Sequence, residues 1–241
     1  EDTEAVATVT LDEQTAKSVA ETVEKDYYDI LKDGTESYEA DGTEKASDTI
    51  TYSVKKYCQH ILNNSDSYDA NTIAVIKKIL NYGSYSQQYF SYNMANLAND
   101  MLEDTEKTLT KQADLMKASS TFHANNVNGI KYFGKSLILR SKTDMRIYFE
   151  LTDSTKKISD YTFKCDGKVL KPVQNGSKYY VDIADITPAE YGKVFTVTVS
   201  GKNFVSSSVY DYCRSAVSSS TTDGKLKNLS VSMYELGTTV Q

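Results

Sequence analysis

One segment of this chain occurs twice, and this repetition limits the possible folds more than any other feature. The residues Ser53-Val54-Lys55-Lys56-Tyr57-Cys58 are echoed 155 residues later by Ser208-Val209-Tyr210-Asp211-Tyr212-Cys213. A polar gap follows each copy, and a second apolar segment then begins. With one residue deleted the copies stay aligned, so that Val75, Ile79, Tyr82, Gly83 and Gln87 correspond to Leu229, Met233, Leu236, Gly237 and Gln241. A duplicated unit of this size is typical of array proteins, whose modules serve binding or spacing.

Apolar residues of the first copy recur at helical spacing. Residues 52–64 have them at i, i+3, i+4, i+7 and i+8, which predicts an amphipathic helix. These residues are Val54, Tyr57, Cys58, Ile61 and Leu62. After a polar connector, which we interpret as a helix cap, a second helix is expected from about Asp69 to Tyr92. The pair predicts a helical hairpin, and residues 206–241 predict a second, truncated one.

Between residues 121 and 205 the period changes from 3.6 to 2, which indicates half-buried strands. The alternating segments are Ile130-x-Tyr132, Leu137-x-Leu139, Met145-x-Ile147-x-Phe149 and Val194-x-Thr196-x-Thr198. Asp166-Gly167 and Asn175-Gly176 are strong hairpin dipeptides. Six or seven short strands in this stretch predict an immunoglobulin-like antiparallel sandwich.

Two segments allow more than one interpretation. Residues 1–51 contain a helical spacing, but Val9-x-Leu11 also aligns with Val181-x-Ile183, which favours strands that close a preceding β module. We expect a short helical turn near 15–21 and a hairpin at Asp41-Gly42 in this part. The segment from 99 to 120 predicts one polar helix or a helix in two pieces.

The predicted fold class is therefore α+β, an immunoglobulin-like antiparallel β-sandwich alternating with amphipathic helical hairpins. The expected domains are the partial β module (1–51), a helical domain (52–120), the β-sandwich (121–205) and the second hairpin (206–241). Because the chain starts with Glu1 and not with Met, we expect a fragment of a longer, processed protein.

Composition argues against several function classes. The net charge of −6 and the pI near 5.1 argue against nucleic acid as a partner. No apolar run reaches the roughly 18 residues of a membrane-spanning helix. The two histidines and three cysteines show no metal-ligand spacing, and we interpret Cys58, Cys165 and Cys213 as buried apolar residues. We expect no enzyme activity, no cofactor and no metal.

The second predicted helix has two different faces. One face is apolar and carries Gly83 at its centre, which would let a neighbouring element approach closely. The opposite face combines tyrosines with amides, as protein-recognition surfaces do, and makes its residues the candidate binding site. They are Lys78, Asn81, Tyr85, Gln88, Tyr89 and Tyr92. The alternative is that the neighbouring sandwich covers this face and the tyrosines are inter-domain packing.

Several segments resemble a known family of repeat modules. "TYSVKKYCQHILNN" (51–64), "IKKILNYGSYSQQYFSYN" (76–93), "NLAN" (96–99) and "YFGKSLILRSKTDMRIYF" (132–149) resemble the repeat module of large surface proteins of gut Firmicutes such as ruminococci. The resemblance implies a sandwich followed by a helical hairpin, displayed outside the cell and without catalytic activity. Some proteins of this kind bind antibody heavy-chain variable domains as superantigens do, and others attach starch or join cellulosomal scaffolds.

The sequence therefore predicts a non-catalytic, extracellular binding module of the bacterial cell surface. Its most specific form is recognition of a host immunoglobulin heavy-chain variable domain. The alternatives are a carbohydrate (starch or glycan) adhesion module, which the absence of Trp disfavours, and a passive structural spacer.

Overall fold

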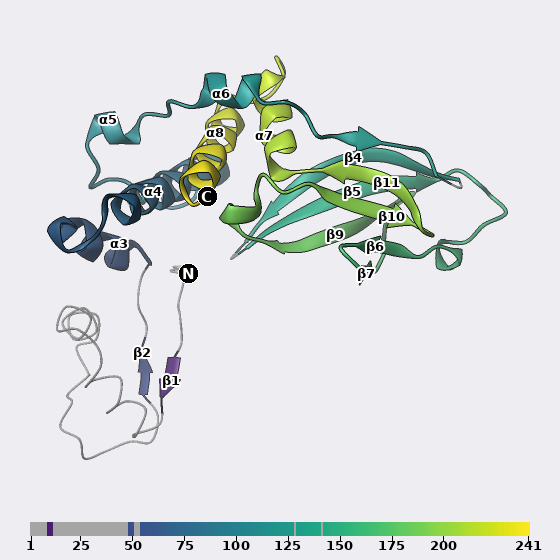
Figure 1. Cartoon of the computed structure of the whole chain (residues 1–241), viewed down its shortest axis with the longest axis horizontal. Helices are drawn as coiled ribbons and strands as arrows, with labels where there is room; N and C mark the ends of the chain where they lie inside the picture. Colours follow the sequence, from purple (N-terminus) through teal and green to yellow (C-terminus); the bar gives the residue numbers. More distant parts are fainter. Residues whose placement is uncertain (1–8, 12–47, 51–53, 128, 141) are drawn as a thin grey trace. The chain divides into compact units, whose positions relative to one another are not determined.

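The computed structural model describes residues 9–11, 48–50, 54–127, 129–140 and 142–241 (Figure 1). Helices and antiparallel sheets are both present, which confirms the α+β class. The chain divides into two compact units, Glu1–Ile76 and Lys77–Gln241, and the division falls within helix α4 (Ala70–Phe90). The boundaries that we placed after residues 51, 120 and 205 remain predictions.

The first unit contains a small antiparallel ladder and the start of the first helical pair. Strands β1 (Val9–Leu11) and β2 (Asp48–Ile50) pair antiparallel, in agreement with a strand at Val9-x-Leu11. The expected hairpin at Asp41-Gly42 and the helical turn near 15–21 lie outside the described residues. Helix α3 (Val54–Asn63) and the 3₁₀ helix η1 (Ser65–Ser67) follow. The carboxylate of Asp69 then accepts the backbone N–H of Thr72 at 2.9 Å at the start of α4, which is a capping bond.

The helices of the two repeats begin at equivalent positions. Adding 155 to the bounds of α3 gives those of α7 (Val209–Ser218), and adding 154 to the first residue of α4 gives the first residue of α8 (Gly224–Thr239). Cys58 and Cys213 occupy the same repeat position and are 1% and 0% exposed. Burial raises the pKa of Cys58 to about 11 and that of Cys213 to about 12, so both are protonated thiols packed as apolar groups.

Two antiparallel sheets form most of the second unit, and its described residues hold nine strands where six or seven were expected. The five-stranded sheet has the order β3-β11-β10-β6-β7, and the four-stranded sheet has the order β4-β5-β9-β8. The strands are β3 (His123–Ala124), β4 (Ile130–Leu139), β5 (Thr143–Leu151), β6 (Phe163–Cys165), β7 (Lys168–Leu170), β8 (Val173–Asn175), β9 (Lys178–Ile186), β10 (Phe195–Val199) and β11 (Lys202–Ser207). The 3₁₀ helices η2 (Ile158–Asp160) and η3 (Pro188–Glu190) lie in the connections.

The two predicted hairpin dipeptides stand at tight turns. Asp166 (φ 48°) and Gly167 (φ 79°) both have positive φ and join β6 to β7, as a two-residue hairpin loop requires. Gly176 (φ 62°) begins the loop between β8 and β9. Side chains of the two sheets meet in one core, where Phe149 of β5 stacks on Phe163 of β6 with ring centroids 4.8 Å apart.

Strand β10 has the predicted period but the opposite inward face. Phe195, Val197 and Val199 are buried, whereas the intervening Thr196 and Thr198, from which we had read the alternation, are half-buried. The buried set and the threonine set both recur with a period of 2, so the period alone does not show which set faces the core.

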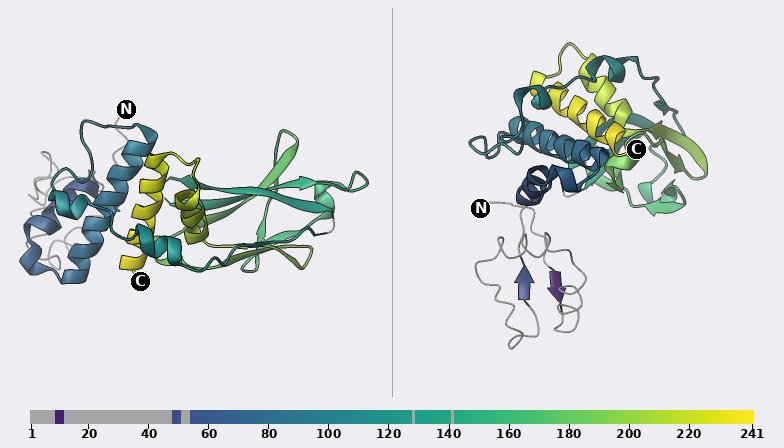
Figure 2. Two further views of the ribbon diagram at one scale, coloured as in Figure 1. Left: turned by 90° about the horizontal axis from the view of Figure 1, so that it is seen from above. Right: turned by 60° about the vertical axis from the view of Figure 1, so that its left-hand side comes forward.

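Helices α7 and α8 pack against each other and lie at one end of the two sheets (Figure 2). Helix α8 is buried around most of its circumference: residues 229–237 are buried except for the half-buried Tyr234. Such a helix is part of the core rather than a surface element. The segment from 99 to 120 holds two short helices, α5 (Asp104–Lys107) and α6 (Gln112–Lys117), which agrees with a helix in two pieces.

The two repeated glycines are in close contact with different neighbours, which leads to a stability prediction. A Cβ at Gly83 would lie 3.0 Å from the Cβ of Ala98, whereas a Cβ at Gly237 would lie 2.5 Å from the hydroxyl of Tyr210 and 3.1 Å from the backbone oxygen of Pro188. We expect Gly237→Ala to lower the free energy of unfolding by about 1–3 kcal/mol. Gly83→Ala should be close to neutral, because the gain in helix propensity, about 1 kcal/mol, offsets a small shift of Ala98. Urea unfolding of both variants checks this, and equal losses would contradict it.

Candidate binding site at the end of helix α4

Five of the six candidate residues lie on helix α4, and Tyr92 lies two residues after its last residue. All six belong to the second unit. Most of this face is not exposed to solvent as a free binding surface would be: Asn81 is 1% exposed, and Lys78, Tyr85, Gln88 and Tyr89 are half-buried. The protein's own chain covers much of it.

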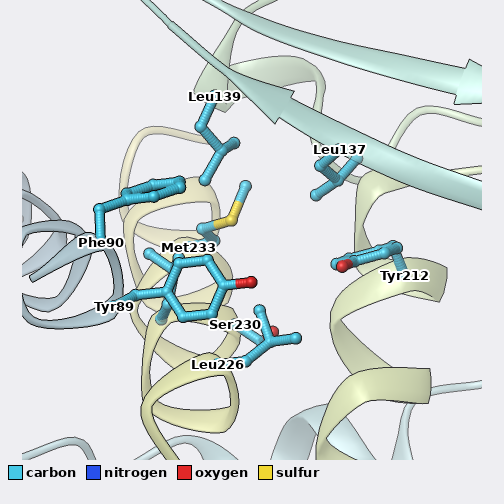
Figure 3. A pocket seen from close by; sticks show the side chains of 9 residues that line it. Tyr89, Phe90, Leu137, Leu139, Tyr212, Leu226, Ser230 and Met233 are labelled. Atoms are coloured by element: carbon cyan, nitrogen blue, oxygen red, sulfur yellow. The ribbon is translucent and has the colours of Figure 1, made fainter. Parts of the chain in front are cut away.

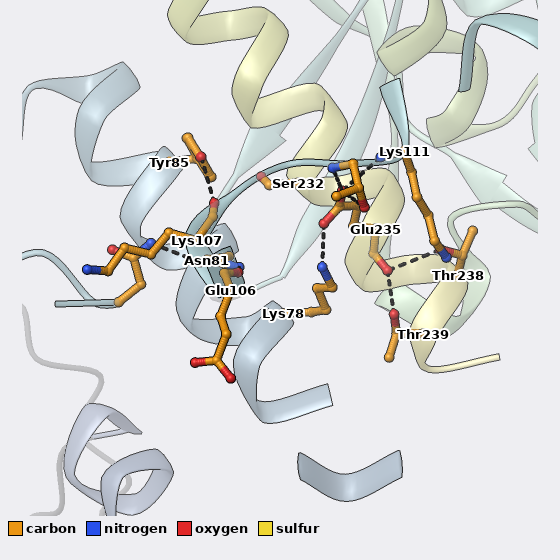
Figure 4. A network of polar contacts seen from close by, with 12 residues as sticks. Lys78, Asn81, Tyr85, Glu106, Lys107, Lys111, Ser232, Glu235, Thr238 and Thr239 are labelled. Carbon is orange, nitrogen blue, oxygen red and sulfur yellow. Dashed lines mark hydrogen bonds and ion pairs between the residues drawn. The ribbon is translucent and has the colours of Figure 1, made fainter. Parts of the chain in front are cut away.

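Glu235 of α8 is the centre of a buried polar network that covers the first part of this face (Figure 4). Its carboxylate is 0% exposed and forms an ion pair with Lys78 at 2.6 Å. It also accepts the backbone N–H groups of Thr110 at 2.6 Å and Lys111 at 3.0 Å. Burial raises the pKa of Glu235, but the hydrogen bonds from Lys78, Lys111 and Thr110 outweigh it and leave the pKa below its usual value. The carboxylate is therefore charged and fully satisfied at neutral pH.

The segment that joins α4 to the sheets lies along the same face. Asn81 donates to the backbone oxygen of Glu106 at 2.7 Å and accepts from Asn99 at 2.8 Å. The hydroxyl of Tyr85 donates to the backbone oxygen of Lys107 at 3.0 Å. Asn81 and Tyr85 thus hold this returning segment, which covers their part of the face.

The C-terminal end of α4 has a different environment, because a cavity lined mostly by apolar side chains opens beside it (Figure 3). The cavity has a volume of about 110 Å³. Side chains from α4, β4, α7 and α8 line it, and none is charged: Tyr89, Phe90, Leu137, Leu139, Tyr212, Leu226, Leu229, Ser230 and Met233. The hydroxyl groups of Tyr89 and Tyr212 point into it. Ser230 adds a hydroxyl from a residue that is 1% exposed.

Exposed apolar side chains lie at and just after this end of the helix. Phe90, which lines the cavity, is 57% exposed, Tyr92 is 42% exposed and Met94 is 49% exposed. Gln87 holds the turn that carries Tyr92 and Met94: its side chain donates to the backbone oxygen of Asn96 at 3.0 Å and accepts the N–H of Ala98 at 2.7 Å. Large exposed apolar groups, here within five residues of one another, and a cavity lined mostly by apolar side chains both mark interaction sites. We call Tyr89, Phe90, Tyr92, Met94 and the cavity the α4-end site.

Sequence reasoning therefore found part of this site and missed the rest. It named Tyr89 and Tyr92, but it did not predict that Phe90 is exposed. It also did not predict that Leu137, Leu139 and Tyr212 lie near helix α4. The cavity depends on how β4, α7 and α8 meet α4, and no local spacing contains that information. Glu235 could have been noticed as a lone acidic residue among the apolar residues of the second repeat.

The described residues hold no group of three or more His, Cys, Asp or Glu side chains that could bind a metal ion. Within the same part of the chain, no helix has the length and apolar character needed to span a bilayer. No protein-family model, curated protein or solved structure matches this chain.

Proposed function

We propose that the chain is a non-catalytic binding module of an extracellular bacterial surface protein and that it binds a protein partner at the α4-end site. The observation that carries this proposal is the uncharged cavity of about 110 Å³ with the exposed Phe90 at its edge. Such a cavity is smaller than the roughly 300–1,000 Å³ of ordinary small-molecule pockets. It has the size for one apolar side chain of a partner, and anchors of this kind dominate protein interfaces.

The arrangement of the strands supports an immunoglobulin-like sandwich as the scaffold of this module. If β4, β5, β8 and β9 are taken as strands A, B, D and E, the four-stranded sheet has the order A-B-E-D. The strands β11-β10-β6 then correspond to G-F-C of the opposite sheet, with β7 as an added edge strand and β3 beside β11. This assignment is part of the proposal, together with the description of α7 and α8 as a helical hairpin.

We propose an antibody heavy-chain variable domain as the partner. The resemblance to repeat modules of ruminococcal surface proteins supports this choice, and an exposed aromatic group beside an uncharged cavity is suited to a protein surface. The α4-end site replaces the longer face from Lys78 to Tyr92 as the proposed contact, because Lys78, Asn81 and Tyr85 are engaged within the chain.

The test is the affinity of the chain for recombinant heavy-chain variable domains of each family, measured by biolayer interferometry. Phe90→Ala should weaken binding by about 2 kcal/mol, the scale of an interface hot spot. Because the Phe90 side chain is 57% exposed, this change should leave the melting temperature within about one degree.

Val169→Ala is the matched control, because Val169 is a 65% exposed apolar residue on β7 that lies outside the site. Its affinity should equal that of the wild type. Equal affinities for the wild type and Phe90→Ala would rule out the α4-end site, and no binding to any variable domain would leave the carbohydrate-adhesion and spacer interpretations.

A further inference from the structure

The outer face of the four-stranded sheet carries aromatic rings on three adjacent strands. Phe133 comes from β4, Tyr148 from β5 and Tyr180 from β9, and the last two are paired residues whose ring centroids are 6.0 Å apart. Phe133 is the extra residue of a bulge between Tyr132 and Gly134 and is 54% exposed. Bulges re-aim side chains, and here the bulge adds a third aromatic ring, that of Phe133, to the two tyrosines of this face.

Fixed polar groups lie among these rings. Arg146 donates two hydrogen bonds to the carboxylate of Asp182, at 2.7 and 2.8 Å, and its guanidinium carbon lies 3.6 Å from the centre of the Tyr180 ring. The ammonium of Lys178 lies 3.1 Å from the centre of the Phe133 ring. These contacts hold the polar side chains in place before any ligand arrives, which lowers the entropy lost on binding.

A gap in the face, where a side chain would otherwise stand, lies at Gly134 next to Phe133. Gly134 pairs with Tyr148, and a Cβ built on Gly134 would meet no atom within 4 Å. The hydroxyl of Tyr148 instead lies 3.4 Å from that of Ser136, two residues further along β4. A glycine inside a strand weakens the strand and commonly marks a place where a ligand comes close to the backbone.

The outward positions of this face are balanced in charge. Lys131, Arg146 and Lys178 are matched by Asp144, Glu150 and Asp182. A balanced face does not attract an anion or a cation over a long range, and it therefore suits an uncharged ligand.

We propose that this face binds a neutral oligosaccharide, with one sugar ring over Gly134 between Phe133 and Tyr148. A pyranose ring has apolar C–H faces that stack on an aromatic ring and a rim of hydroxyl groups that need donors and acceptors. Tyr148 supplies the ring, and the Arg146–Asp182 pair and Lys178 supply charged hydrogen-bond partners, which bind more strongly than neutral ones. This binding activity is separate from the protein-binding proposal, because none of its residues belongs to the α4-end site.

The experiment is a screen of the chain on an array of neutral and acidic glycans, followed by calorimetry with maltoheptaose, xylohexaose and cellohexaose. We expect binding to at least one neutral oligosaccharide. Gly134→Val should abolish it, because the added side chain fills the gap. The same variant should leave the melting temperature unchanged or raised, since Gly134 has no positive φ and valine is favoured in strands. Tyr148→Ala should weaken binding about tenfold.

Phe90→Ala is the matched control and should bind the sugar as the wild type does. Because the two proposals use different residues, a failure of the protein-binding proposal would not affect this one. Three results would overturn the proposal: no neutral glycan bound by the wild type, binding only to acidic glycans, or wild-type affinity in Gly134→Val.

Discussion

Replacing Glu235 with glutamine lowers the free energy of unfolding by about 3–5 kcal/mol, the usual cost of removing one partner of a buried ion pair. The change leaves the Lys78 ammonium, whose side chain is 23% exposed, opposite a neutral amide. It also weakens the acceptor for the N–H groups of Thr110 and Lys111. Urea unfolding at pH 7 measures the loss.

Glu106→Gln is the matched control for this prediction. Glu106 also forms an ion pair, with Lys77, but both side chains are about one-third exposed. Its loss should therefore cost less than about 1 kcal/mol. A double-mutant cycle with Lys78→Met should give a coupling energy of about 1–3 kcal/mol between positions 78 and 235. A loss at Glu235 no larger than that at Glu106 would contradict the network in Figure 4.

The same network makes stability depend on pH in a defined direction. The pKa of Glu235 is lower in the folded protein than in the unfolded chain, where it is near 4.5. The contribution of Glu235 to stability is therefore fully present above pH 4.5 and is lost as the pH falls through the pKa of the folded state. The difference in unfolding free energy between the wild type and Glu235→Gln should therefore shrink below about pH 4.5. Parallel urea titrations at pH 7 and pH 3.5 measure it, and a difference that does not change with pH would contradict this origin.

Replacing Asp211 with alanine lowers the free energy of unfolding by about 3 kcal/mol, because several donors lose one buried acceptor. Asp211 is 4% exposed, and its carboxylate accepts the N–H of Ser208 at 2.9 Å and the N–H and hydroxyl of Thr121 at 2.8 and 2.5 Å. It thus closes the capping box of α7 and also fixes the segment that leads into the sheets.

Asp223→Ala is the control for Asp211, because Asp223 caps the next helix, α8, from an exposed position. A single exposed cap is worth about 1 kcal/mol. Thermal or urea unfolding of both variants separates the two contributions. Losses of equal size would show that Asp211 acts only as a helix cap and does not fix the segment around Thr121.

Features with a local cause could be predicted from the sequence. The helices of both repeats begin where the repeated apolar pattern begins, and the turns at Asp166-Gly167 and at Gly176 follow from the positive φ that glycine allows. The burial of Cys58, Cys165 and Cys213 followed from their positions among apolar residues.

Features that depend on long-range packing could not be predicted. Lys78 and Glu235 are 157 residues apart, and only the tertiary structure brings them together. Without that contact, Lys78, Asn81 and Tyr85 have the sequence pattern of an exposed binding face. The inward face of β10 could not be predicted for the same reason, because the choice depends on the opposite sheet. The cavity of the α4-end site likewise needs β4, α7 and α8 in place around α4.

The most direct test of the central proposal is a pull-down of pooled polyclonal IgA and IgG on the immobilised chain, with the bound antibodies typed by heavy-chain variable family. We predict enrichment of particular heavy-chain families on the wild-type chain, retained by Val169→Ala and lost with Phe90→Ala. No enrichment on the wild type, or equal enrichment on Phe90→Ala, would contradict antibody binding at the α4-end site.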